Sequence, residues 1–305
     1  MKLVDAISAF LNSMKGIKSP ATTKWYRRRL KSLEEFLGSN TSTKNITVNN
    51  LRLWRATLAD RENRYEHHPT RPTEPGGLSV DTLHGYVRAI RRFFTWLVEE
   101  DILTNNPAKR FELPPTQKRP KAGISDRDRR AMIDCAQDYP RDYAMLMFAA
   151  DTGCRAGGIA GLRMKDLDIS RGRATVFEKG RGGNRKGRTV YFLSDTAIAL
   201  RKLMSIRSQG EEFVFVSSRG GGLTSSGVYL IFKRVAIKAN ARGKWSPHQW
   251  RHWRARTWAE RGMNLGIVAQ LLGHSDVKVT SEYYGTFADA DLQKAHQRYS
   301  LGDIL

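Results

Sequence analysis

The chain has 305 residues, of which 40% are apolar, so it can bury at least one core, and its length favours two domains over one. Lysine and arginine number 52 against 30 acidic residues, and the resulting net charge of +22 favours a polyanionic partner, nucleic acid first. The basic residues are interleaved with aromatic and aliphatic ones, and both residues 1–120 (+9) and residues 121–305 (+13) are basic. This distribution argues against disorder and against a ribosomal or chromatin protein with charged tails.

Cysteine content and hydropathy disfavour two further classes. Cys135 and Cys154 are too few for a disulfide framework or a zinc site, and we expect both to be reduced. No stretch approaches the roughly 18 uninterrupted apolar residues of a membrane span. The start, MKLVDAISAFLNSMKG, lacks the apolar core and cleavage site of a secretory signal. We expect a soluble, cytoplasmic protein that does not contact a membrane.

The first half of the chain has helical periodicity. From Tyr26 to Leu37, apolar residues recur on one stripe of a helix that begins near residue 20. A shorter helix is expected around 51–58, and the segment 66–77 is expected to be a loop because it is rich in Pro and Gly. The next helix is the strongest in this half, with Ser79 as its N-cap and an end near Asp101.

Basic residues lie on the polar faces of the two longer helices. They are Lys24, Arg27, Arg28 and Lys31 on the first helix, and Arg88, Arg91 and Arg92 on the second. Because this half of the chain carries a charge of +9, we favour contact with phosphate over a merely solvated surface.

A proline-rich, basic stretch at 106–123 separates the two halves. It can be neither a helix nor a central strand. The sequence therefore predicts a helical DNA-binding domain at 1–112, a linker at 113–123 and a second domain at 124–305. The second domain begins with a helix, because Ser125 and Asp128 have the spacing of a capping box.

The second domain changes character along its length. ATVFEK and RTVYFL are rich in β-branched and aromatic residues and are separated by GRGGNRKG, which predicts a β-hairpin with a long basic turn. FVFVSS at 213–218 is predicted to be another strand. From 224 onward the pattern is helical, with a cap at Thr224 and breaks at Pro247 and Gly273. The expected fold is mainly α with a small antiparallel β-sheet in the C-terminal domain.

Four segments of this domain contain an ordered set of polar residues: TGCRAGGIAGLRMKDLD at 152–168, the hairpin, HQWRH at 248–252 and LLGHSDVKVTSEYYG at 271–285. In order and spacing they resemble the conserved boxes of the tyrosine recombinases, the phage integrase family, and the resemblance extends over nearly the whole chain. Each box alone is weak, whereas the ordered set is highly specific. The resemblance implies the catalytic residues Arg155, Lys179, His248, Arg251 and His274 and the nucleophile Tyr283.

The chemistry explains why these residue types occur together. When a phosphodiester is cleaved, negative charge builds on the non-bridging oxygens in the transition state. The guanidiniums of Arg155 and Arg251 can each bind those oxygens through two hydrogen bonds, and His274 would add a third donor. A tyrosine phenol ordinarily has a pKa of about 10 and needs a proton acceptor, for which His248 is the candidate.

The chain departs from the family pattern at three places. The resemblance implies that Lys179 protonates the departing 5′ oxygen, but the hairpin turn is longer than usual and also offers Lys186. Tyr284 directly follows Tyr283, so the nucleophile could be shifted by one residue, although the family spacing from the Leu-Gly-His box selects Tyr283. The family commonly has an acidic residue three positions after the first arginine, and this chain has Gly158 there. Another group must therefore orient the arginine.

The resemblance implies that neither a metal nor ATP is needed. Arginines supply the charge that divalent ions supply in many nucleases, and the phosphotyrosyl bond conserves the energy of the broken linkage. Asp151, Asp166 and Asp168 could suggest a metal site, but we expect solvated helix-end or loop carboxylates. In the H-x-x-R box, we expect Trp250 and Trp253 to pack in the core and His252 to support the helix.

The resemblance also implies the partners. Two domains would clamp duplex DNA, with Arg181 and Arg185 of the hairpin binding it, and four protomers on two sites would exchange strands through a Holliday junction. Accessory DNA-bending or directionality proteins would be further partners, and the nucleoid the location. Two alternatives remain: a type IB topoisomerase, against which the N-terminal half argues, and a DNA-binding protein without catalysis. Integration, excision, transposition and dimer resolution all fit this chemistry.

Overall fold

The computed structural model describes residues 1–64, 72–115, 123–179, 185–208, 210–274 and 276–284, and the side chains at 179, 185, 186, 279 and 282–284 lie outside this description. The chain divides into two compact units, Met1–Gln117 and Lys118–Leu305, each with its own hydrophobic core. The boundary falls inside residues 113–123, and the limits 1–112 and 124–305 stay a prediction. In the described residues, no helix is long and apolar enough to cross a membrane.

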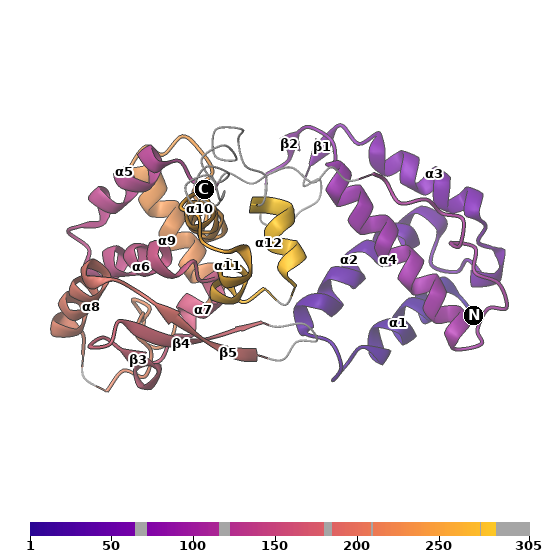
Figure 1. The fold of residues 1–305 in the computed structure, drawn as a ribbon. Helices are drawn as coiled ribbons and strands as arrows, with labels where there is room; N and C mark the ends of the chain where they lie inside the picture. Colours follow the sequence, from indigo (N-terminus) through magenta and orange to yellow (C-terminus); the bar gives the residue numbers. More distant parts are fainter. Residues whose placement is uncertain (65–71, 116–122, 180–184, 209, 275, 285–305) are drawn as a thin grey trace, which may run out of the picture. The chain divides into compact units, whose positions relative to one another are not determined.

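The first unit packs four α-helices around one core (Figure 1): α1 (Leu3–Ser13), α2 (Pro20–Leu37), α3 (Val48–Ala59) and α4 (Val80–Glu99), with a 3₁₀ turn at Thr43–Asn45. Phe10 of α1 lies at the centre, where its ring centroid is 5.4 Å from that of Phe93 and 5.3 Å from that of Trp96. The helices that the sequence predicts from residue 20, around 51–58 and after Ser79 are confirmed. The Ser79 hydroxyl accepts the N–H of Thr82, as an N-cap does.

Two features of the first unit differ from the sequence expectation. Helix α1 was not predicted, although Leu3, Ile7 and Phe10 follow helical spacing and are buried. The segment 66–77 was expected to be a loop, but Glu74–Pro75 (β2) pairs antiparallel with Asn63–Arg64 (β1). The Arg64 guanidinium donates to the carbonyls of two glycines just after β2, and these bonds hold the short ladder closed.

The second unit is mainly helical with one small sheet, as the sequence predicts (Figure 1). Its helices are α5 (Asp126–Ala136), α6 (Pro140–Thr152), α7 (Ala156–Ala160), α8 (Ser194–Ile206), α9 (Ser225–Lys238), α10 (Pro247–Glu260), α11 (Leu265–Leu272) and α12 (Val277–Tyr284). A 3₁₀ turn at Met164–Asp166 precedes the sheet. The antiparallel order is β3 (Leu167–Asp168), β4 (Arg173–Lys179), β5 (Arg185–Tyr191).

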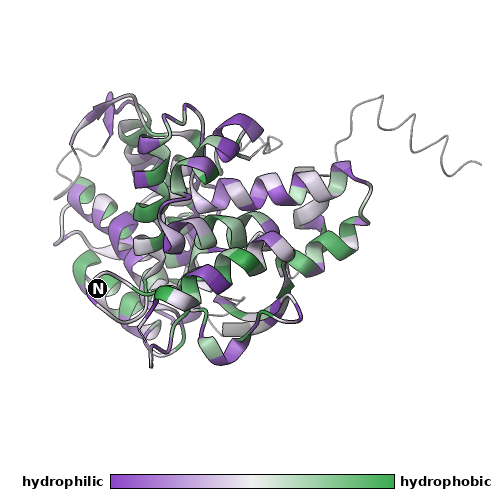
Figure 2. Ribbon diagram, turned by 90° about the vertical axis from the view of Figure 1, so that its left-hand side faces the viewer, coloured by the Kyte–Doolittle hydropathy of each residue, from purple (hydrophilic) through white to green (hydrophobic). Residues whose placement is uncertain are grey.

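The core of the second unit lies between α6, α8, α9 and α10. Trp250 of α10 is fully buried there and meets the Phe232 ring edge-on at 5.5 Å, which confirms its assignment to the core. Hydrophobic and hydrophilic residues alternate along the helices in Figure 2, as expected for helices with one buried side.

The hairpin turn is shorter than the sequence suggests. Strand β5 begins at Arg185, which pairs with Lys179, and Lys186 pairs with Glu178. Lys186 therefore lies in the ladder, and only residues 180–184 connect the strands. The expectation of a turn covering GRGGNRKG was wrong because a ladder joins backbone groups and tolerates side chains of low β propensity.

The predicted strand at 213–218 is not present. This segment makes only isolated bridges, between Arg163 and Phe213 and between Val216 and Gly222. Val214 and Phe215 are buried in the core. The apolar run therefore reflects burial of an irregular segment, which periodicity alone cannot distinguish from a strand.

The predicted helix ends are observed, with one change. Thr224 caps α9, Pro247 begins α10, and Gly273 follows α11 with a left-handed φ of 67°. Ser125 accepts the N–H of Asp128 at 3.1 Å, which is half of a capping box. The Asp128 carboxylate is buried and instead accepts N–H groups of residues 242 and 243, far away in sequence.

Candidate active site

Arg155 stands at the start of α7. Helix α6 ends at Gly153, whose φ is 59°, and the chain turns at once into α7 with Arg155 as N-cap residue. The Arg155 Nη1 atom lies 2.6 Å from Oε2 of Glu178 in β4, and the Arg155 N–H donates to Oε1 at 2.7 Å. The Arg155 side chain stays 37% exposed. One carboxylate thus holds both the backbone and the guanidinium while part of the guanidinium remains accessible.

Arg251 lies in α10 and is only 1% exposed. Its Nη1 donates to the carbonyl of Gly153 at 2.9 Å and its Nη2 to the carbonyl of Leu272 at 2.6 Å. Burial, and then the positive charge of Arg155, lower the pKa of Arg251 to about 10. The guanidinium is therefore still charged at neutral pH.

His274 follows the left-handed Gly273 that ends α11. Its Nδ1 lies 2.7 Å from the hydroxyl oxygen of Thr280, which is buried in α12. Burial, and then the positive charges of Arg251 and Arg155, lower the pKa of His274 to about 4. The ring is therefore neutral at neutral pH, and when Thr280 donates to Nδ1 the Nε2 atom carries the proton and can donate.

Glu178 and Arg188 complete this cluster, although no sequence motif indicated a role for either residue. Glu178 is 5% exposed, and Arg188 of β5 donates to its Oε1 at 3.3 Å. Arg188 also donates to the carbonyl of Leu271. Burial raises the pKa of the Glu178 carboxyl, but Arg188, Arg251 and the N–H of Arg155 outweigh it, so the pKa lies below its usual range. Two features of the sequence could have indicated the role of Glu178: the family's acidic residue is missing at position 158, and an acidic residue stands beside Lys179.

The cluster carries an excess of positive charge. The guanidiniums of Arg155, Arg188 and Arg251 face the single carboxylate of Glu178, and all three lower the pKa of His274. Arg251 is desolvated, so its field is weakly screened. Such a cluster is suited to an anion, and a phosphate matches the paired N–H donors of guanidinium groups.

His248 is exposed in the first turn of α10, three residues before Arg251. The ring of His252, one turn later, lies 4.3 Å from it, centroid to centroid, at an angle of 73°. His252 is 4% exposed, so a buried ring lies against the exposed one, and its expected support of the helix stays a prediction. Trp253 packs against the core as expected, although it is only partly buried: it donates to Asp126 and lies under the guanidinium of Arg129.

Known family profiles match both halves of the chain. The phage integrase SAM-like domain matches residues 2–113, and the phage integrase family matches residues 126–289, more than half of the chain. The chain belongs to the phage integrase family. This membership makes it a tyrosine recombinase, as the four boxes of the sequence indicate.

Named relatives agree with this assignment. A tyrosine recombinase XerC of Oceanobacillus iheyensis is 29% identical over 295 residues, covering 92% of this chain and 90% of the relative. A tyrosine recombinase XerC of Escherichia coli O157:H7 is 28% identical over 270 residues, covering 87% and 85%. The solved Tn1549 transposon integrase in complex with a circular intermediate DNA has a TM-score of 0.77 at 17% identity, covering 98% of this chain and 100% of that one. It shares the fold.

Two of this recombinase's implied catalytic residues are described only in their backbone. Lys179 is the last residue of β4, and Tyr283 lies in the last turn of α12. The alternative lysine, Lys186, is the second residue of β5, and the alternative tyrosine, Tyr284, is the last residue of α12. The side chains of all four lie outside the described part, so their roles stay predictions.

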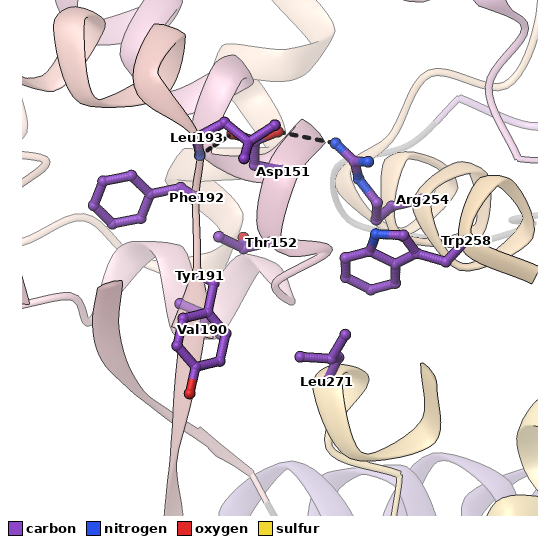
Figure 3. Close-up of a pocket in the computed structure, with 9 residues that line it drawn as sticks. All are labelled: Asp151, Thr152, Val190, Tyr191, Phe192, Leu193, Arg254, Trp258 and Leu271. Atoms are coloured by element: carbon purple, nitrogen blue, oxygen red, sulfur yellow. Dashed lines mark hydrogen bonds and ion pairs between the residues drawn. The ribbon is translucent and has the colours of Figure 1, made fainter. Parts of the chain in front are cut away.

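Asp151 and Asp168, two of the carboxylates that could suggest a metal site, bind neighbouring groups of the protein. Asp151 was expected to be solvated, but its oxygens accept hydrogen bonds from the N–H of Leu193 and from Arg254, both at 2.9 Å (Figure 3). The Thr196 hydroxyl also donates to Asp151, at 2.7 Å. The expectation was wrong because the end of α6 lies against the start of α8 and against α10. Asp168 was expected at a helix end or in a loop but is the last residue of β3, and it accepts hydrogen bonds from the turn that follows the strand. Within the described residues, no group of three or more potential ligands could hold a metal ion.

The structure describes the side chains of most, but not all, of the basic residues proposed for DNA binding. Those on α2 are exposed, and on α4 Arg88 and Arg92 are exposed whereas Arg91 is half-buried. Arg185 belongs to β5, and Arg181 lies outside the described residues. Arg29, which no sequence pattern singled out, stacks 3.8 Å above the Trp25 ring and 5.2 Å from the Tyr86 ring, between these two helices. Contact of these residues with DNA stays a prediction.

Proposed function

We propose that this protein is a site-specific DNA recombinase that cuts and rejoins duplex DNA through a 3′-phosphotyrosyl intermediate. The observation that carries the proposal is the cluster of Arg155, Arg251 and neutral His274 with its excess of positive charge. A phosphodiester is a poor electrophile, and this arrangement stabilises the charge that develops on its non-bridging oxygens.

In the proposed reaction each site residue either binds the phosphate or transfers a proton. Arg155 and Arg251 bind the non-bridging oxygens, and His274 donates to one of them from Nε2. His248 accepts the phenolic proton as Tyr283 attacks the phosphorus, and Lys179 protonates the 5′ oxygen as it leaves. Reversal of these steps by an incoming 5′ hydroxyl rejoins the strand.

The proposed partner is duplex DNA, bound by both domains. The relatives named as recombinases and the integrase solved with DNA support this partner, and the basic faces of α2 and α4 together with Arg181 and Arg185 of the hairpin would contact phosphates. We propose that four protomers pair two sites and exchange strands through a Holliday junction, with accessory DNA-bending proteins where the task needs them. The nucleoid is then the place of action.

The test is covalent capture. A nicked suicide substrate traps the phosphotyrosyl adduct, which appears as a protein–DNA band on a denaturing gel. The Tyr283→Phe variant is expected to give no adduct and Tyr284→Phe to retain it, because neighbouring helical residues differ in direction by about 100° and only one can reach the phosphate. The reverse result would move the nucleophile by one residue, and adducts from both variants would refute a single nucleophile.

A second assay separates recombination from topoisomerase-like relaxation. Wild-type protein is expected to join two DNA sites and to leave supercoiled DNA without such a site unrelaxed. Relaxation of any supercoiled plasmid, with no joint product, contradicts the recombinase proposal.

A further inference from the structure

Arg155 is held by a carboxylate from an unexpected element. The position three residues after Arg155, where the family commonly has an acid, is Gly158 in α7. The carboxylate that binds the Arg155 guanidinium and N–H belongs instead to Glu178, 23 residues away in strand β4.

Gly158 and Glu178 compete for one space. A Cβ atom on Gly158 would lie 2.8 Å from Oε1 and 3.0 Å from Cγ of Glu178. Atoms without a bond or hydrogen bond between them do not approach so closely, so a side chain at 158 and the present position of Glu178 exclude each other. The same geometry means that an Asp at 158 would place its carboxylate close to where the Glu178 carboxylate now lies.

The Glu178 carboxylate is buried and ionised. Its side chain is 5% exposed, and burying a charge without a partner is costly. Arg155 binds one side of the carboxylate at 2.6 Å and Arg188 the other at 3.3 Å. Arg188 is only 12% exposed and also donates to the Leu271 carbonyl. The carboxylate therefore has little freedom and fixes the direction of Arg155.

We propose that Glu178 is the positioning residue of Arg155 in this chain, and that the glycine at 158 leaves the space for it: the orienting carboxylate has moved from helix α7 to strand β4. The inference rests on the proposed function, because positioning matters only if Arg155 binds the reacting phosphate. Glu178 immediately precedes Lys179, so the same ion pair ties the end of β4 to the start of α7.

The decisive experiment is a carboxylate swap, read out as the single-turnover rate constant of adduct formation at saturating suicide substrate. Glu178→Gln keeps the shape and removes the charge, and is expected to slow the step about 10²-fold, as misplacement of a catalytic group does. The swap variant Gly158→Asp with Glu178→Ala is expected to be at least about tenfold faster than Glu178→Ala alone. A swap variant no faster than Glu178→Ala overturns the relocation.

Two alanine variants form a matched pair. Gly158→Ala is expected to slow adduct formation while Glu178 is present, and to have little effect in a Glu178→Ala background. Gly157→Ala is the control, because Gly157 is exposed and its Cβ would meet only the Ser225 hydroxyl at 3.2 Å. Equal slowing by the two single variants contradicts the competition for space.

The readout separates positioning from structure. Partial unfolding lowers the amplitude of the adduct and the melting temperature, whereas misplacement of Arg155 lowers the rate constant of the folded enzyme. If Glu178→Gln unfolds, the swap variant alone tests the inference. Adduct formation faster than in Glu178→Ala supports the inference, and a folded swap variant that is no faster overturns it. Wild-type protein that forms no adduct refutes the proposed function itself, whereas a wild-type adduct with an unchanged Glu178→Gln rate refutes only this inference.

Discussion

Arg155 and Arg251 keep their positive charge in different surroundings. Arg155 is partly exposed and paired with a carboxylate, whereas Arg251 is buried and donates to two carbonyls. Carbonyl acceptors do not neutralise the guanidinium, so Arg251 retains its full field toward a bound anion. With a pKa of about 10, it loses its proton only well above neutral pH. Arg251 therefore stays a cation at neutral pH.

His274 should make the stability of the fold depend on pH. Its pKa falls from 6.5 to about 4 in the folded protein. Between these values the unfolded chain binds a proton that the folded chain does not, so the stabilisation is present above pH 6.5 and is lost as the pH falls toward 4. We expect wild type to lose more unfolding free energy than His274→Gln between about pH 7 and about pH 5 in urea titrations. Parallel losses would show that the histidine does not contribute.

The identity of the catalytic lysine can be tested with a modified leaving group. A 5′-bridging sulfur leaves without protonation, so it bypasses the general acid. We expect Lys179→Ala to abolish cleavage of normal DNA and to recover it on the sulfur substrate, whereas Lys186→Ala cleaves both. Rescue of Lys186→Ala instead would assign the role to the strand position opposite Glu178.

Among the secondary-structure elements, the C-terminal ends of two helices form the binding site for the Arg251 guanidinium. Helices α6 and α11 both terminate in a left-handed glycine, and the last carbonyls of these helices accept the guanidinium protons. Helix C-termini carry partial negative charge, so they stabilise a buried cation without neutralising it. Strands β4 and β5 approach from the other side with Glu178 and Arg188. The site is thus assembled from helix ends and one hairpin.

Gly153 should be needed for activity as well as for stability. It has a φ of 59°, and a Cβ there would lie 3.0 Å from a Leu272 methyl group. Gly153→Ala is expected to cost about 1–2 kcal/mol through left-handed strain and to slow adduct formation by moving the carbonyl that holds Arg251. Gly220→Ala is the control, since Gly220 has a φ of 80° and open space around it. Denaturation and adduct assays should show strain in both variants and slower cleavage only for Gly153→Ala.

At the scale of the whole molecule, positive charge is divided between both units. The first 120 residues carry +9 and the remainder +13, so neither half is a neutral scaffold. A protein that neutralises several phosphates releases the same number of counterions, and its affinity falls steeply with salt. If both domains bind DNA, as proposed, the affinity should depend on salt through both halves.

Substitutions in the first unit test that prediction. Arg27→Ala and Arg28→Ala change exposed residues of α2, and each lost phosphate contact should lower the slope of log affinity against log salt by about 1. Arg52→Ala is the control, because Arg52 is paired with Glu112 at 2.8 Å. Slopes measured by fluorescence anisotropy that do not change in the α2 variants would remove this helix from the DNA interface.

Local sequence patterns were enough to identify the family and the mainly helical class, and they predict the ordered catalytic set. These rest on local patterns: caps such as Ser79, helix stops such as Gly273, and short boxes in which His248 and Arg251 lie one helical turn apart. Each depends on residues within a few positions of one another, so it can be read before the chain folds.

The partner of each carboxylate depends on contacts between segments that are distant in the sequence. The Asp128 carboxylate accepts N–H groups that lie 114 and 115 residues away instead of completing its helix cap. Asp151 binds Arg254 at a separation of 103 residues, and Glu178 binds Arg155 at a separation of 23. The sequence shows that the family's acidic residue is missing at Gly158, but not that Glu178 binds Arg155 in its place. Desolvation and packing bring these groups together, and a buried charge takes whichever partner the fold places beside it.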